Sequence, residues 1–288
     1  MAKGSVTASD KYILAAREEI AAWESGKRGY LARLGDLAFD TPAKLGATLV
    51  PQAVQRSACQ VIEKTLRLTA HAGKFSIDVE NITRQRNRKL GNKKALGSRL
   101  KACDELARKF WNTHSGYAAA EGAATGLLGF AGFIADIPLI LSIAIRSIRT
   151  VALCYGYSTA HPPETDYALH ILRIGSSSKK EIKAQTLAML RDMEKSVIFK
   201  APPAKKRGAP AKRSLEPQYF TLEEYAKSLA IELVQRRALR LVPIAGMVTA
   251  VSFNATYAHD IGRTAFMCYR RRFIEENAVF SPVKTRAV

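Results

Sequence analysis

The apolar residues of this chain recur mostly at intervals of three and four, the spacing that places them on one face of an α-helix. Helical patterns run from Ser9 or Asp10 to Glu24, from Gln52 to Ala72, from Pro162 through Leu172, from about Lys179 to Phe199, and onward from Thr221 or Leu222. No segment alternates apolar and polar residues over the length of a strand. The pattern therefore predicts an all-α protein.

Two stretches are apolar over most of their length. Residues 118–145 carry only Glu121 and Asp136 as charges, and residues 241–258 carry none. About 20 apolar residues suffice to cross a bilayer. However, Asp136 would then lie in mid-span at roughly 2.5–3.5 kcal/mol, and Pro138 would break or kink the helix. We expect buried core helices, with residues 136–138 forming a turn or a helix start capped by Asp136; shallow membrane insertion is the alternative.

Both stretches carry small residues at helical spacing. These residues are Gly122, Gly126, Gly129 and Gly132 in the first stretch, and Gly246, Ala250 and Gly262 along the second and just beyond it. Small ridges of this kind let two helix backbones approach closely, in membranes and in soluble bundles alike. We therefore expect one helical-bundle domain with a glycine-rich apolar helix pair at its core.

Polar residues within and beside the same stretches would meet if the two helices pack together. They are Glu121, Asp136, Asn254, His259, Asp260 and Arg263. In one interpretation they neutralise and hydrogen-bond one another, with Asn254 bonding across the interface. In the other, burial shifts their pKa values and prepares a proton transfer. We favour the first interpretation; the chain also lacks a P-loop, a nucleophile elbow and a zinc-protease motif.

The composition adds a large positive charge, with 45 Lys and Arg against 25 Asp and Glu and a formal net charge of +20. Such a surplus repels itself and indicates an anionic partner, which is nucleic acid, anionic lipid or an acidic protein. Basic residues are concentrated in two segments. The first contains Arg84, Arg86, Arg88, Lys89, Lys93 and Lys94. The second is a proline-rich segment at 200–217, which we expect to be a flexible loop and which contains Lys205, Lys206, Arg207, Lys212 and Arg213.

Metal, cofactor and redox chemistry find little support in the sequence. The four cysteines lack metal or redox spacing, which fits buried thiols in a reducing cytoplasm. Asp166 and His170 are four residues apart and could supply half a metal site, but residues 161–166 already read as a helix start. We expect neither metal nor cofactor. The N-terminus has no apolar signal region, so secretion is not expected.

Three segments resemble the EcsC protein family of bacteria. They are EGAATGLLGFAGFIADIP at 121–138, Tyr155-Gly156-Tyr157, and VPIAGMVTAVSFNATYAHDIGRTA at 242–265, in which Pro243, Gly246, Asn254, Asp260, Arg263 and Ala265 resemble the ending of that family. The resemblance covers about residues 50–275, so we expect an N-terminal helical extension over 1–50 and an EcsC-like domain over 51–288. It implies a helical domain without catalytic residues to carry over. The family is named for a protein encoded beside an ABC transporter, which hints at membrane work.

Three functional hypotheses follow. The leading one is a non-enzymatic cytoplasmic protein that associates peripherally with anionic lipid on the inner face of the cell membrane, alongside a transporter or membrane complex. The second is a nucleic-acid binder that uses residues 84–101 and 205–213. The third is an enzyme with a buried acid–base pair around Asp136 and Asp260. A protein partner stays open, and no small-molecule ligand is specified.

Overall fold

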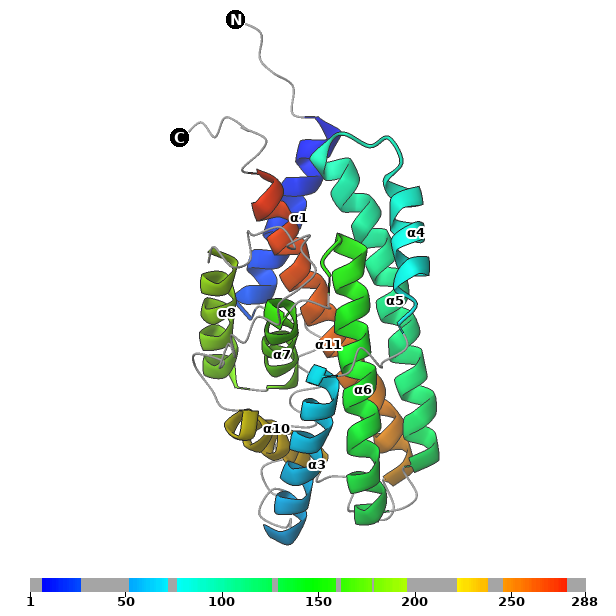
Figure 1. Ribbon diagram of the computed structural model, residues 1–288, viewed down its shortest axis with the longest axis vertical. Helices are drawn as coiled ribbons and strands as arrows, with labels where there is room; N and C mark the ends of the chain where they lie inside the picture. Colours follow the sequence, from blue (N-terminus) through cyan, green and yellow to red (C-terminus); the bar gives the residue numbers. More distant parts are fainter. Residues whose placement is uncertain are drawn as a thin grey trace, which may run out of the picture.

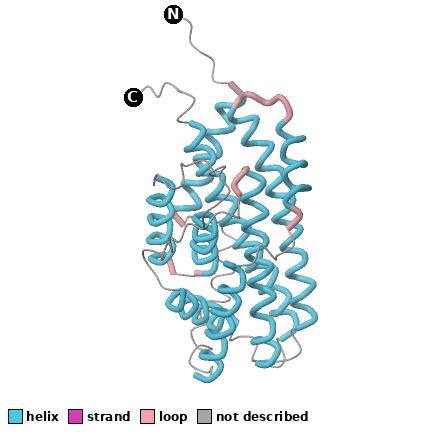
Figure 2. The backbone as a smooth tube through the Cα atoms, viewed as in Figure 1, coloured by secondary structure: helices cyan, strands magenta, loops and turns pink. Residues whose placement is uncertain are grey.

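A computed structural model describes residues 7–26, 52–71, 77–125, 129–158, 162–177, 179–195, 222–237 and 246–278, and all regular structure within these ranges is helical (Figure 2). The helices pack into one bundle-like domain, which confirms the all-α prediction. They are α1 (Ala8–Glu24), α3 (Gln52–His71), α4 (Val79–Leu90), α5 (Leu96–Thr125), α6 (Gly129–Tyr155), α7 (Pro162–Ser176), α8 (Lys180–Lys195), α10 (Leu222–Arg237) and α11 (Gly246–Ala278). The predicted boundary at residue 50 stays a prediction.

Three long helices, α5, α6 and α11, run along most of the length of the molecule (Figure 1). The contact between α11 and α5 is the most extensive between any two of the described helices. Both helices also pack on α6. The remaining helices surround these three, with α1 and α8 beside the upper part of α11 and with α3 and α10 at the lower part of the view. The long helices therefore form the frame that positions every other element.

Helix α6 corrects the expectation at Pro138. The helix is continuous from Gly129 to Tyr155 with Pro138 inside it, so residues 136–138 form neither a turn nor a helix start. A proline in a helix interior costs about 3 kcal/mol through a lost backbone bond and a steric clash. Ile137, Ile140 and Leu141 beside it are fully buried, and burying each such side chain contributes about 1.5–3 kcal/mol. Burial of the flanking residues therefore outweighs the local cost.

Within the described ranges, α6 is the helix whose length and composition would suit a bilayer span, over Ile134–Tyr155 with a mean hydropathy of 1.7. The protein itself buries 72% of the most apolar window of that segment. Helices α3, α4, α5, α7 and α11 all contact α6. This burial agrees with the expectation of a core helix.

Several helix ends follow from local sequence. Thr7 caps α1 through a reciprocal pair of hydrogen bonds with Asp10, slightly before the predicted start. Gly91 and Gly156 adopt φ values of +45° and +95°, which L side chains rarely adopt, and they end α4 and α6. The basic run at 84–101 is accordingly divided between two helices. Helix α7 begins at Pro162, as its sequence predicts.

The described thiols also agree with the sequence. Cys103, Cys154 and Cys268 are buried, Cys59 is half-buried, and none of these four forms a disulfide within the described residues. Burial raises the pKa of the Cys103 and Cys268 thiols to about 12. These thiols therefore stay protonated and unreactive at neutral pH.

The buried imidazole of His114 predicts an acid-sensitive fold. Burial, reinforced by Arg146, lowers the pKa of His114 to about 4 from its ordinary 6.5. Between these values the unfolded chain binds the proton and the folded chain does not, so stability is lost as pH falls from 6.5 and levels off below 4. We expect His114 to contribute a loss of about 2–3 kcal/mol over this window. Urea unfolding at each end of the window measures it.

The control is the variant His114→Gln, which should flatten the pH dependence by that amount. Part of the slope should persist because burial also lowers the pKa of His170 to about 4. Asp166 acts in the opposite direction, since burial raises its pKa to about 6 and its protonation favours the folded state. An unchanged slope in His114→Gln would contradict the assignment to His114.

Candidate functional site

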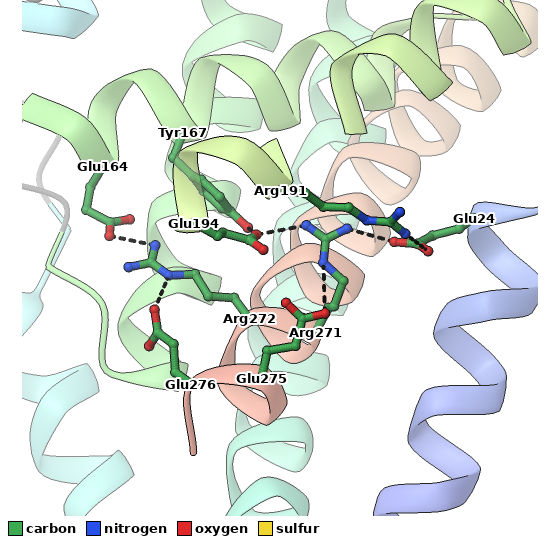
Figure 3. Close-up of polar contacts among 9 residues, drawn as sticks. All are labelled: Glu24, Glu164, Tyr167, Arg191, Glu194, Arg271, Arg272, Glu275 and Glu276. Carbon is green, nitrogen blue, oxygen red and sulfur yellow. Dashed lines mark hydrogen bonds and ion pairs between the residues drawn. The ribbon is translucent and has the colours of Figure 1, made fainter. Parts of the chain in front are cut away.

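Three consecutive arginines near the end of α11 are almost completely buried. Arg270, Arg271 and Arg272 have only 3%, 5% and 3% of their surfaces exposed. Consecutive residues on an α-helix point about 100° apart, so the three side chains reach different neighbours. Buried charges require ionic and hydrogen-bonding partners, and each of these arginines has them. Figure 3 shows the partners of Arg271 and Arg272.

Arg270 points between α1 and α5. Its Nε lies 2.8 Å from Asp104 Oδ2, and its Nη1 donates to Glu19 Oε2 at 2.5 Å. Asp104 also accepts hydrogen bonds from Tyr12 at 2.8 Å and from Tyr155 at 2.7 Å. Burial raises the pKa of Asp104, whereas Arg270 and the two hydroxyls oppose that shift. The buried carboxylate thus has two hydroxyl donors and an arginine at ion-pair distance.

Arg271 points between α1 and α8. It donates to Glu24 Oε1 at 2.7 Å and to Glu194 Oε1 at 2.8 Å. Glu194 also accepts from the Tyr167 hydroxyl at 2.5 Å, and Glu24 accepts from Arg191 at 2.5 Å. Figure 3 shows Arg271 between Glu24 of α1 and Glu194 of α8, with Glu275 of α11 4.0 Å from its Nε.

Arg272 points toward α7. It donates to Glu164 Oε1 and to Glu276 Oε1, both at 2.7 Å. Its guanidinium carbon lies 4.0 Å from the ring centroid of Tyr157, whose hydroxyl donates to Glu276 at 2.9 Å. Burial by itself lowers the pKa of Arg272, but Glu164, Tyr157 and Glu276 outweigh burial and raise it. Arg272 therefore remains a cation throughout the range in which proteins fold.

We refer to these three neighbouring clusters of contacts together as the arginine network. Its members are Arg270, Arg271 and Arg272 with Glu19, Glu24, Asp104, Glu164, Glu194 and Glu276. It connects α1, α5, α7 and α8 to α11. Buried ion pairs of this kind contribute little net stability compared with apolar packing. Removing one partner, however, leaves the other as an unpaired buried charge, which is strongly destabilising. The network therefore sets which helices can lie against α11.

Sequence analysis did not identify this network, although α11 contains a signal for it. The segment Phe266–Glu276 reads FMCYRRRFIEE, in which three arginines interrupt apolar residues. Three consecutive helical positions span about 200° of the circumference, so they cannot all face solvent if the flanking residues are buried. The acids that pair with them lie elsewhere in the sequence, and their identity was not accessible from that segment.

The predicted polar cluster is only partly brought together. Asp136 and Asn254 are fully buried, and Asn254 Nδ2 donates to Asp136 Oδ2 at 3.4 Å, between two of the residues that we assigned to the cluster. In contrast, the side chains of His259 and Asp260 are 48% and 45% exposed, with His259 Nδ1 3.9 Å from Asp260 Oδ1. These two residues and the exposed Arg263 do not share the burial that we expected. The side chain of Glu121 lies outside the described residues.

The reason for the difference is the angular position of these residues on α11. Asn254, Ala258 and Ile261 are fully buried and lie on the packed face of the helix. His259 and Asp260 follow Ala258 by 100° and 200° of rotation, which turns them away from that face. The structure thus does not bury Asp260 with Asp136 as the acid–base hypothesis requires.

The small-residue ridges are described only in part. Gly122 lies in α5, Gly129 and Gly132 in α6, and Gly246 and Ala250 in α11, but Gly126 lies outside the described residues. Gly262 is closely packed, because a Cβ atom built on it would lie 2.2 Å from Cδ1 of Trp111, but this neighbour is an aromatic side chain and not the other small-residue ridge. The helix backbone therefore touches the Trp111 ring at this point.

The first basic segment forms a surface on α4 and the turn that follows it. Arg84, Arg88, Lys93 and Lys94 are exposed, whereas Arg86 and Lys89 are half-buried. Arg84 pairs with Glu80 on its own helix at 2.7 Å, and Lys89 pairs with Glu105 at 2.8 Å. An open, shallow depression along α4 includes Arg84 and Arg88 in its lining. The second segment, from Lys205 and Lys206 through Arg207 to Lys212 and Arg213, lies outside the described residues.

Among the described residues, no group of three His, Cys, Asp or Glu side chains is placed so that it could hold a metal ion. Asp166 and His170 do lie on the same helix, α7, four residues apart. No third ligand joins them among the described side chains.

Comparison with known proteins adds a family relationship. A model of the EcsC protein family matches residues 15–274. The chain is 23% identical over 267 residues to the "Uncharacterized protein YdbA" of Bacillus subtilis (strain 168), covering 90% of this chain and 92% of that protein. It is 25% identical over 175 residues to the "Protein EcsC" of the same organism, covering 61% of this chain and 65% of that protein. No solved structure matches.

Proposed function

The chain belongs to the EcsC protein family, and we propose that it is a non-enzymatic helical protein that binds peripherally to the anionic inner surface of the cell membrane, alongside a transporter or another membrane complex. One observation carries the proposal. Four exposed basic side chains lie together on α4 and the turn after it, namely Arg84, Arg88, Lys93 and Lys94, which we call the α4 basic surface.

Among the residues that the structure describes, few acidic side chains pair with this surface. Of its four members, Arg84 forms an ion pair with Glu80, and that pair is highly exposed at 73% and 84% of the two side chains. An exposed pair of this kind contributes little and is screened by salt, so Arg84 can exchange its partner readily. Each Lys or Arg close to an anionic membrane contributes about 1 kcal/mol of attraction. Four such residues therefore support binding that depends on anionic lipid and on ionic strength.

The glycine-rich stretches have a different role in this proposal. Helix α5 has 30 residues and so spans about 45 Å between the turn before it and its glycine-rich end. In Figure 1 that turn lies at the top, and the glycine-rich ends of α5, α6 and α11 lie at the bottom. Docking through α4 therefore does not require these ends to enter lipid. We propose that the two stretches form a core helix pair, as the Asn254–Asp136 bond supports.

Nucleic acid is the other anionic partner with a matching charge. Proteins that bind single strands combine basic grooves with aromatic side chains on which bases stack. Residues 79–95, which include the α4 basic surface, contain no aromatic residue. This composition favours a lipid surface over nucleic acid, and the experiment below includes both.

We expect Arg84→Gln/Arg88→Gln to bind about 30-fold more weakly than the parent to vesicles that contain phosphatidylglycerol. The reason is the loss of two charges worth about 1 kcal/mol each. Glutamine and arginine have similar helix propensities, so α4 should stay folded. Flotation of the full-length chain with anionic and neutral vesicles measures the binding.

The matched control is Arg56→Gln/Lys64→Gln, which removes the same charge from exposed positions on α3. It should bind vesicles almost as the parent does, because a loss of net charge away from the α4 basic surface should change the binding little. Equal loss in both variants, or no binding of the parent to anionic vesicles at physiological salt, would contradict the proposal. Binding of DNA or RNA in a gel shift without vesicle binding would favour the nucleic-acid alternative.

A further inference from the structure

Helix α1 rests on the body of the protein with a small apolar contact. Ala16 and Ile20 are its buried apolar side chains, and Leu14 is 55% exposed. Tyr12, Ile13 and Trp23 pack only partly buried against the core. For a helix of 17 residues this is a modest apolar surface. Polar contacts therefore carry much of what holds α1 in place.

The polar contacts of α1 include the Tyr12–Asp104 and Ser9–Gly97 hydrogen bonds, and its ion pairs with the other helices are made by two glutamates. Glu19 accepts from Arg270 at 2.5 Å and lies 3.5 Å from Arg108. Glu24 accepts from Arg271 at 2.7 Å and from Arg191 at 2.5 Å, as Figure 3 shows. Four arginines from α5, α8 and α11 thus meet carboxylates that belong to α1. We call these arginines the α1-covered site.

Arginine forks bind carboxylate and phosphate by the same geometry, with two parallel hydrogen bonds and a full positive charge. If α1 were displaced, Arg108 and Arg191 would lose the carboxylates with which they pair. Arg270 would keep its pair with Asp104, and Arg271 would keep its pair with Glu194. The N–H groups of each that now face Glu19 or Glu24 would be left for another acceptor. The exposed surface would then carry donors arranged around the two positions that Glu19 and Glu24 had occupied.

We propose that α1 is a removable cover over an anion-binding site, and that Glu19 and Glu24 hold the places taken by phosphate groups when α1 is displaced. The ligand is a phosphate-bearing anion, either a free phosphate compound or a lipid headgroup. Residues 27–51 separate α1 from α3 in the sequence. Because a chain reaches at most about 3.3–3.6 Å per residue, this covalent length does not forbid displacement of α1 while α3 keeps its position.

This inference does not rest on the α4 basic surface. Helix α1 contacts α5 and α11, whereas α4 contacts α5 and α6. The two surfaces can consequently be tested separately, and the variant Arg84→Gln/Arg88→Gln should respond to a free phosphate probe as the parent does.

The test follows hydrogen–deuterium exchange of α1 in the full-length chain. In Glu19→Gln/Glu24→Gln the charged contacts are weakened, so the amides of residues 8–24 should exchange at least about tenfold faster than in the parent. The control Glu18→Gln/Glu181→Gln removes the same charge from exposed positions on α1 and α8 and should leave this exchange unchanged. Unchanged exchange in Glu19→Gln/Glu24→Gln would overturn the removable cover.

The ligand is tested with inorganic pyrophosphate and with vesicles of phosphatidylglycerol and phosphatidylcholine. Both are compared with sodium chloride at equal ionic strength, which separates binding from screening. We expect at least one probe to accelerate exchange of α1 in the parent and to bind Glu19→Gln/Glu24→Gln about tenfold more tightly. A response to pyrophosphate alone assigns a free phosphate compound, and a response to vesicles alone assigns a headgroup. If neither probe acts beyond sodium chloride, the anion-binding site is wrong.

Discussion

Replacing Arg272 by methionine is expected to lower the free energy of unfolding by about 3–5 kcal/mol, the largest single effect that the structure predicts. Arg272 is 3% exposed and bonds to Glu164 and Glu276. Methionine fills much of the same volume but leaves Glu164, itself 7% exposed, without the guanidinium that neutralises it. The loss therefore comes mainly from a stranded buried carboxylate. Urea unfolding near neutral pH measures it.

The pH dependence distinguishes this mechanism from a packing defect. Burial already raises the pKa of Glu164, and Arg272 is the main group that opposes the shift. Without Arg272 the pKa of Glu164 should rise further above its value in the unfolded chain. A carboxyl group with a raised folded pKa destabilises the fold above that pKa and ceases to do so as it becomes protonated. The deficit of Arg272→Met relative to the parent should therefore shrink as pH falls.

Two further variants complete the test. Arg263→Met changes an exposed arginine on the same helix and should stay within about 0.5 kcal/mol of the parent. Arg272→Met/Glu164→Gln removes the stranded charge and should recover part of the loss, which gives a coupling energy between the two residues. Equal stability of Arg272→Met and Arg263→Met would show that the buried pair does not act as described.

Replacing Gly262 by alanine is expected to lower the free energy of unfolding by about 1–3 kcal/mol, although alanine is the better helix former. The added Cβ would lie 2.2 Å from Cδ1 of Trp111, far inside van der Waals contact. The Trp111 ring has little freedom to yield, since His259 and Phe266 lie 4.8 Å and 5.9 Å from it between ring centroids. The helices α5 and α11 would have to separate locally.

Gly116 offers the opposite outcome for the same substitution. It lies inside α5, and a Cβ atom built on it meets nothing within 4 Å. Gly116→Ala should therefore raise stability by up to about 1 kcal/mol through helix propensity alone. Thermal unfolding of the two variants beside the parent gives both signs in one experiment. A stabilising Gly262→Ala would mean that α5 and α11 do not approach as closely as the structure shows.

Much of the secondary structure was predictable because its causes are local. The end of α6 at Gly156 and the start of α7 at Pro162 depend on residues within one helical turn. The prediction of a turn or helix start at residues 136–138 was wrong, because it considered only the local effect of Pro138. Its local effect is to break a helix, but the burial of Ile137, Ile140 and Leu141 by other helices prevailed.

The candidate site was less predictable, and the particular residues show why. The bond between Asn254 and Asp136 followed from two apolar stretches that had to bury their polar members together. His259 and Asp260 were assigned to the same cluster because they are close in sequence, yet helical rotation turns them outward. Proximity along the chain was therefore a poor guide to membership of a buried cluster.

By itself the sequence determined the helical class, several helix ends and the large positive charge, since these depend on local spacing and composition. Only the tertiary structure decided which acids meet the three arginines of α11. Arg270 pairs with Glu19, 251 positions away, and Arg272 pairs with Glu164, 108 positions away. A buried charge must find an opposite charge, but which one it finds depends on how whole helices pack, and no local pattern contains that information.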